Sequence, residues 1–158
     1  MTLGTGLGSG DYDSASRAST AHWEGQVTRY VIGPDVALML AEQQAEIPGH
    51  HRLLAPTLLR SQVLAQLYSQ VRQGALAKKE ASARLDYLRG LQIRLLGDRV
   101  LQQVAWKMAE RIGLADTFVA EYLALTELQG DALVVLDPDL AKMAGTVVPV
   151  APVEQLFS

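Results

Sequence analysis

Ala132-Leu-Val-Val-Leu-Asp137 is a continuous apolar run that ends in an aspartate, and Pro138 follows it. An apolar run without alternating polar residues is typical of a strand that is covered on both faces. Near the other end of the chain, Tyr30-Val-Ile-Gly-Pro-Asp35 has the same form, because an apolar run again leads to an aspartate just before a helical stretch. The two stretches therefore predict strands of a parallel sheet, each followed by a helix.

Between these stretches, short apolar runs alternate with longer amphipathic segments. The spacing predicts strands over residues 29–33, 53–55, 91–95, 132–136 and 146–150. It predicts helices over residues 36–45, 56–73, 77–89, 98–111 and 117–129, and a short helix that begins at 137. This alternation predicts an α/β fold, with a small parallel sheet between two layers of helices and right-handed crossovers.

The composition is that of one soluble globular domain. The chain has 158 residues, of which 49% are hydrophobic and 20% are charged. It has no cysteine, which excludes disulfides, thiolate zinc sites, iron–sulfur clusters and cysteine nucleophiles. A net charge of −3 argues against wholesale coating of nucleic acid or anionic membrane, although it allows a local basic cleft.

No apolar run approaches the roughly 20 residues of a membrane span. The N-terminus also lacks the apolar region of a secretory signal. We therefore expect a cytoplasmic protein without a membrane partner.

The first 27 residues differ from the rest. Glycines alternate with small residues, and serines and threonines follow them. Ser9 and Asp11 stand where a G-x-G-x-x-G nucleotide loop would need its third glycine. We therefore expect residues 1–27 to be a flexible Gly/Ser-rich extension, because they offer little apolar surface to offset their ordering entropy. Residues 28–158 then form the folded domain.

Asp35 and Asp137 follow two strands of the predicted sheet. Since parallel strands end at the same edge, we expect both carboxylates to face one crevice. Paired carboxylates repel each other, so a structure that gathers them usually supplies a cation. Hard oxygen ligands suit Mg²⁺ or Mn²⁺, which can bind a phosphodiester oxygen and activate water. The alternative is that each aspartate only caps a helix, and the pattern by itself favours this role.

A family resemblance changes that balance. From Tyr30 to about Val150 the chain resembles the PIN domain, and specifically the VapC-type toxins of bacterial toxin–antitoxin pairs. Five segments carry the resemblance in matching order and spacing. They are Val31-Ile-Gly-Pro-Asp35-Val-Ala-Leu, Leu54-Ala-Pro-Thr-Leu-Leu-Arg-Ser-Gln62-Val-Leu, Ala105-Trp-Lys-Met-Ala-Glu-Arg-Ile-Gly-Leu114, Thr117-Phe-Val-Ala-Glu-Tyr-Leu-Ala-Leu-Thr126 and Ala132-Leu-Val-Val-Leu-Asp137-Pro-Asp-Leu140.

The resemblance implies a PIN-like three-layer α/β/α domain. It also implies a metal-dependent endoribonuclease that cleaves RNA and is neutralised by a cognate antitoxin. The family holds Mg²⁺ with three or four acidic residues. Asp35 matches the first acid and Asp137 matches the last. Gln62 stands where a glutamate is expected, and Val119 stands where an aspartate is expected.

Other acids are candidates for the missing ligands. Asp116 lies three residues before Val119, and Asp98 opens the preceding helix, so either can face the crevice or simply cap its helix. Glu121 lies about 200° around the helix from Val119, and we expect it to point elsewhere. Gln62 can offer one neutral oxygen, a poorer ligand than a carboxylate.

The shortened acidic set leaves a second function open. In this second hypothesis, the chain is a catalytically impaired PIN domain that acts as an RNA- or antitoxin-binding module. Whether it forms a homodimer also stays open.

The remaining polar and aromatic residues give weaker signals. His50 and His51 lack partners at metal-ligand spacing, so we expect them at the surface. Trp106 and Tyr122 occupy inward helical positions and are expected in the core. Four basic residues are candidates for an RNA groove, although scattered cations on helices are usually solvated: Arg60, Arg94, Arg99 and Lys107.

Overall fold

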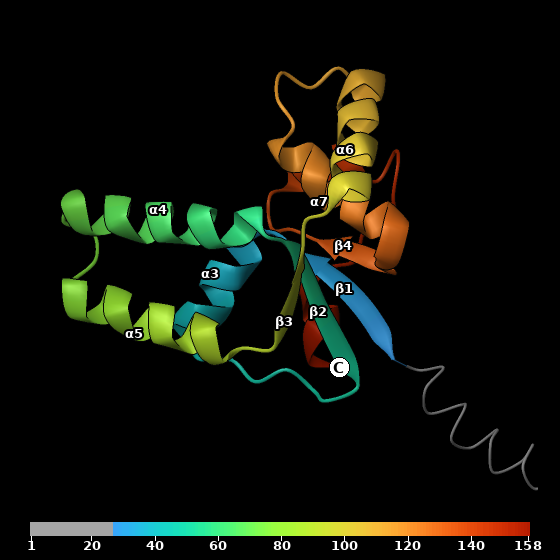
Figure 1. Ribbon diagram of the computed structural model, residues 1–158. Coiled ribbons are helices and arrows are strands. Elements are labelled where there is room, and N and C mark those ends of the chain that lie inside the picture. The colour runs from blue at the N-terminus through green and yellow to red at the C-terminus, as the bar shows by residue number, and fades with distance from the viewer. Residues whose placement is uncertain (1–26) are drawn as a thin grey trace, which may run out of the picture.

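A computed structural model describes residues 27–158, which form an α/β domain with four strands and six α-helices (Figure 1). The strands are β1 (Thr28–Ile32), β2 (His51–Pro56), β3 (Ile93–Leu96) and β4 (Ala132–Val134). The helices are α3 (Pro34–Gln43), α4 (Leu58–Arg72), α5 (Lys78–Gly90), α6 (Arg99–Ile112), α7 (Phe118–Gln129) and α8 (Pro138–Ala144). A 3-10 helix, η2 (Val153–Phe157), ends the chain. The predicted alternation of strands and helices is confirmed. The proposed extension falls almost wholly on residues 1–26, which lie outside the described part.

The four strands form one all-parallel sheet in the order β3-β2-β1-β4. In its register, Tyr30 of β1 lies opposite Leu53 of β2 on one side and opposite Ala132 of β4 on the other. The strands that precede Asp35 and Asp137 are therefore neighbours. Their carboxyl ends lie at the same edge, as the sequence predicts.

Helices cover both faces of the sheet. On one face, α7 packs so tightly that a Cβ added to Gly130 would lie 2.8 Å from Cγ2 of Val31. On the other face, the Tyr30 hydroxyl donates a hydrogen bond to Oε1 of Gln155 in η2, at 3.4 Å. Figure 1 shows α4 and α5 side by side, extending from the sheet as an arm, and α6 and α7 packed together on the other side. Together these layers form the three-layer α/β/α arrangement.

The strand predicted over residues 146–150 is wrong. Only a single bridge forms there, between Leu133 and Val150. The amides of Val147 and Val148 both donate to the carbonyl of Ala144, so they continue the turn after α8 instead of joining the sheet.

Two predicted side-chain positions are also wrong. Trp106 is 64% exposed, because α6 turns its neighbour Ala105 to the core, and the next residue lies about 100° around the helix. His51 is only 9% exposed, because it begins β2 instead of lying in a loop and packs edge-on against Tyr30 with ring centroids 5.0 Å apart. Burial and the neighbouring His50 lower the pKa of His51. Tyr122 is buried, as expected.

No helix among residues 27–158 is long and apolar enough to cross a membrane.

Candidate functional site

Asp35 lies at the carboxyl edge of the sheet, in the first turn of α3, and is half-buried. Its Oδ1 accepts a hydrogen bond from the amide of Val36 at 2.8 Å. Its Oδ2 accepts one from the amide of Leu136 at 2.8 Å, across 101 residues of sequence. This carboxylate therefore ties the end of β1 to the segment that leads from β4 to Asp137.

Gly33 makes this close approach possible. Its amide donates to the carbonyl of Val134 at 3.1 Å, which extends the pairing of β1 with β4 by one residue. A Cβ at position 33 would lie 2.9 Å from Oδ1 of Asp35 and 3.1 Å from Cγ1 of Val135. A larger residue here would therefore push the Asp35 carboxylate or the end of β4 out of place.

Asp137 lies next to this junction, one residue after Leu136, and is exposed. It is the N-cap of α8, and its Oδ1 accepts a hydrogen bond from the amide of Asp139 at 3.0 Å. The capping role considered from the sequence is thus confirmed for this residue. The bond engages one carboxylate oxygen, and no other residue among 27–158 donates a hydrogen bond to the second oxygen.

Gln62 and Tyr122 meet between α4 and α7. The Tyr122 hydroxyl donates to Oε1 of Gln62 at 2.6 Å. Tyr122 is only 5% exposed. Burial raises its pKa, and the negative charges of Glu121 and then Asp35 raise it further. The Tyr122 hydroxyl therefore stays neutral and donates to the amide of Gln62.

Glu121 belongs to the same end of α7. It is half-buried, and burial raises the pKa of its carboxyl group. Its charge contributes to the raised pKa of the Tyr122 hydroxyl.

Asp98 and Asp116 both bind helix ends. Oδ1 of Asp98 caps α6 by accepting from the amide of Leu101 at 2.9 Å. Oδ1 of Asp116 accepts from the amide of Phe118, the first residue of α7, at 3.0 Å. Both side chains therefore have the capping role that competed with metal binding. Val119 is partly buried and packs against the core, so it supplies no polar atom.

Within residues 27–158, no three His, Asp or Glu side chains lie together closely enough to hold a metal ion. The oxygen donors near this edge are the carboxylates of Asp35 and Asp137 and the amide of Gln62. Their oxygen chemistry fits Mg²⁺ or Mn²⁺. Both oxygens of Asp35 already accept backbone hydrogen bonds, however, and the Gln62 oxygen accepts from Tyr122. This donor set suits weak binding of a hydrated ion.

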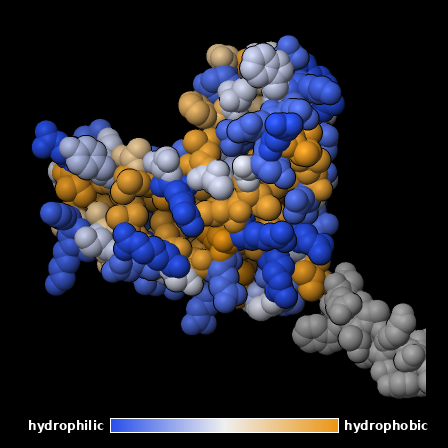
Figure 2. Space-filling model, viewed as in Figure 1, coloured by the Kyte–Doolittle hydropathy of each residue, from blue (hydrophilic) through white to orange (hydrophobic). Residues whose placement is uncertain are grey.

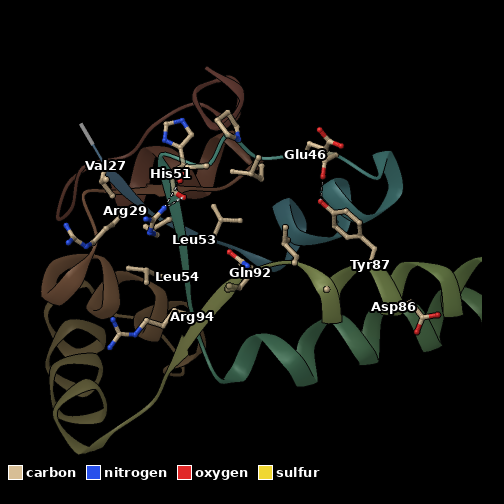
Figure 3. Close-up of a pocket in the computed structure, with 18 residues that line it drawn as sticks. Val27, Arg29, Glu46, His51, Leu53, Leu54, Asp86, Tyr87, Gln92 and Arg94 are labelled. Carbon is tan, nitrogen blue, oxygen red and sulfur yellow. Dashed lines mark hydrogen bonds between the residues drawn. The ribbon is translucent and has the colours of Figure 1, made fainter. Parts of the chain in front are cut away.

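The four predicted basic residues do not form one groove. Arg60 lies on α4, Arg94 on β3, and Arg99 and Lys107 on the exposed face of α6 that also carries Trp106. Arg94 instead lines a hollow of about 1340 Å³ near the amino ends of β1, β2 and β3 (Figure 3). This hollow is at the opposite edge of the sheet from Asp35.

Comparison with known proteins supports the fold. No protein-family model and no curated protein matches the sequence. Among solved structures, the chain is similar to the crystal structure of PAE2754 from Pyrobaculum aerophilum, with a TM-score of 0.62 and 21% sequence identity. The match covers 82% of this chain and 93% of that chain. The α/β architecture is thus shared over nearly the whole length of that protein.

Proposed function

We propose that this protein is a VapC-type toxin of the PIN family, a metal-dependent endoribonuclease that a cognate antitoxin neutralises. The hydrogen bond from Leu136 to Asp35 is the observation that carries the proposal. It brings the first and last family acids to the ends of two adjacent parallel strands. This edge is where open α/β sheets bind their ligands.

Asp35 and Asp137 would hold Mg²⁺ or Mn²⁺ in this proposal. When bound, the metal would polarise the scissile phosphate and lower the pKa of the attacking water. Asp35 stays oriented because two backbone amides hold its carboxylate. Tyr122 and Gln62 keep the adjoining wall of the site neutral and hydrogen-bonded, which limits the repulsion that an RNA phosphate would meet.

A second candidate is a catalytically impaired PIN domain that binds RNA or its antitoxin. The bond between Tyr122 and Gln62 favours it, because it engages the oxygen at the position where the family has a glutamate. The loss of the acid at Val119 favours it too. Each lost carboxylate lowers metal affinity, so the rate of cleavage separates the two candidates.

The test measures cleavage of a labelled single-stranded RNA with and without Mg²⁺ or Mn²⁺. We expect slow metal-dependent cleavage by the wild type and at least a tenfold loss in Asp35→Asn and Asp137→Asn. The matched control is Glu110→Gln, which removes an exposed carboxylate on α6. Thermal melts of all variants check folding, since Asn keeps only part of the hydrogen bonding of Asp35.

Two outcomes would contradict the ribonuclease proposal. One is metal-dependent cleavage that survives in both aspartate variants, since this would indicate a contaminating nuclease or another site. The other is RNA binding in EDTA with no cleavage at any metal concentration, which favours the binding module.

A further inference from the structure

Three arginines lie on one face of the sheet near its amino ends. Arg29 of β1 lies directly opposite Arg52 of β2 in the parallel register. Arg94 of β3 lies opposite Leu54, which is two residues beyond Arg52. Because side chains alternate with a period of two, all three arginines point to the same side of three neighbouring strands.

This face is open where the arginines lie. Val31, two residues after Arg29 on the same face, is buried beneath the end of α7, where it contacts Gly130. Arg29, Arg52 and Arg94 lie nearer the strand beginnings and are all exposed. Figure 2 shows hydrophilic side chains crossing an otherwise apolar surface over the lower part of the sheet.

Among residues 27–158, none of the three guanidinium groups takes part in an ion pair. In the described part of the chain, the ion pair within 4.0 Å is Arg89–Asp86, on the exposed surface of α5. The guanidinium of Arg52 donates to the carbonyls of Gly49 and, at 3.3 Å, of His51. Asp131 is the acid beside Arg29, and its carboxylate accepts from the Arg29 backbone amide at 2.7 Å. Like charges on directly opposed residues destabilise a sheet, so the cluster needs an anion from outside.

The same arginines line the hollow of about 1340 Å³. Two acids also line it, Glu46 and Asp86, but Figure 3 shows them on the far side of the strands from Arg29 and Arg94. One side of the hollow is therefore positive.

We propose that this arginine-lined side of the hollow binds the phosphate backbone of single-stranded RNA. Arginine forks match phosphate geometry, and three of them on adjacent strands can contact successive phosphates. The hollow is broad and open, which suits a passing strand better than an enclosed small molecule. The inference rests on the proposed function in one respect, because the choice of RNA among polyanions comes from it.

This contact is separate from the acidic edge. Arg29 lies near the amino end of β1 and Asp35 beyond its carboxyl end, so their backbones are at most about 20 Å apart, the span of six fully extended residues. The arginines would therefore hold the substrate and leave the chemistry at Asp35 unchanged. Their loss is expected to weaken RNA binding and raise KM, with little effect on kcat.

The test is the salt dependence of RNA binding, measured by fluorescence anisotropy in EDTA with a labelled single-stranded oligonucleotide. We expect the triple variant Arg29→Gln, Arg52→Gln, Arg94→Gln to lower the slope of log K against log[salt] by about 2, or roughly 0.7 per phosphate contact. The matched control removes three other exposed arginines and so has the same net charge: Arg72→Gln, Arg89→Gln and Arg111→Gln. Melting curves check that both variants fold, since the first variant removes the repulsion between the arginines but also the hydrogen bonds that Arg52 donates to the carbonyls of Gly49 and His51.

The inference is overturned if the two triple variants reduce the slope equally, since net charge alone would then explain the effect. It is also overturned if the wild type binds no RNA, or if pyrophosphate binds to the arginines while RNA does not. A specific loss of binding without any cleavage by the wild type would support the arginine contact and contradict the ribonuclease proposal. Normal RNA cleavage by the wild type, together with unaltered RNA binding in the arginine variant, would support the ribonuclease proposal and contradict the arginine contact.

Discussion

At the scale of single residues, Gln62 and Val119 are uncharged at positions where the proposed PIN function would expect carboxylates. Gln62 has the shape of a glutamate, and its Oε1 accepts a hydrogen bond from the Tyr122 hydroxyl. A glutamate there would accept the same hydrogen bond with a full negative charge. The substitution therefore preserves the packing of α4 against α7 while it removes a ligand from the site.

Tyr122→Phe should destabilise the fold at neutral pH by about 1 kcal/mol, because it removes one largely buried hydrogen bond. Above about pH 10 the wild type should lose stability, since tyrosines ionise there in the unfolded chain. The raised pKa keeps Tyr122 protonated in the folded protein, so the folded state binds more protons and stability falls as pH rises. Urea unfolding at pH 8 and pH 11 measures both effects.

The alkaline loss should be smaller in Tyr122→Phe than in the wild type. The stability of Tyr122→Phe should still fall somewhat at alkaline pH, because burial also raises the pKa of Tyr87. An alkaline loss of the same size in both proteins would contradict the assignment to Tyr122.

Val119→Asp places a carboxylate at the position where the proposed PIN function expects one. We expect tighter Mg²⁺ binding, because a third negative charge attracts the cation. We also expect the metal-free protein to be less stable by about 1–3 kcal/mol, since Val119 packs against the core and the new group is polar. Calorimetric titration with Mg²⁺ and thermal melts measure the two effects.

Val119→Asn is the matched control, with a similar shape and no charge. It should lose stability without gaining Mg²⁺ affinity. If the wild type already binds Mg²⁺ tightly and neither substitution alters it, then Glu121, Asp116 or Asp98 completes the site.

At the scale of elements, the site depends on how β1 and β4 end. β1 passes through Gly33 into α3, and β4 passes through Leu136 and Asp137 into α8. Pro34 and Pro138 begin the two helices with the fixed φ that suits a first turn. Two similar strand-to-helix junctions thus lie side by side, and Asp35 joins them.

Gly33→Ala should destabilise the protein by about 1–3 kcal/mol, the usual cost of overpacking. The added Cβ would lie within 3.1 Å of both Asp35 and Val135, so Mg²⁺ binding should weaken as well. Gly90→Ala is the control, since a Cβ at that helix end meets no atom within 4 Å. Denaturant unfolding of the two variants compares them. Equal stabilities would mean that the junction relaxes without cost.

At the scale of the whole molecule, the parallel sheet separates two charged regions. Asp35 and Asp137 follow the carboxyl ends of β1 and β4, and Arg29, Arg52 and Arg94 lie near the amino ends of β1, β2 and β3. The net charge of −3 conceals this division. An RNA strand that spans both edges would be held by the arginines and would reach the acids only with a metal present.

Deletion of residues 1–25 should change the melting temperature by less than about 2 °C, because these residues have few large apolar side chains to bury. Differential scanning calorimetry of the full chain and the truncated chain measures this. A loss of 5 °C or more would indicate that the segment packs against the domain or joins two copies of it.

The sequence by itself determined the elements and the edge at which Asp35 and Asp137 lie. Apolar runs, helical spacing and proline positions are local signals. Because the carboxyl ends of parallel strands meet at one edge of the sheet, residues that follow two such strands lie at that edge. The tertiary structure decided what the side chains contact. The Tyr122–Gln62 bond, the burial of His51 and the exposure of Trp106 depend on how helices rotate against the sheet. The three arginines come together only through strand register, because hydrogen-bonded pairing places residues from distant parts of the chain on one face.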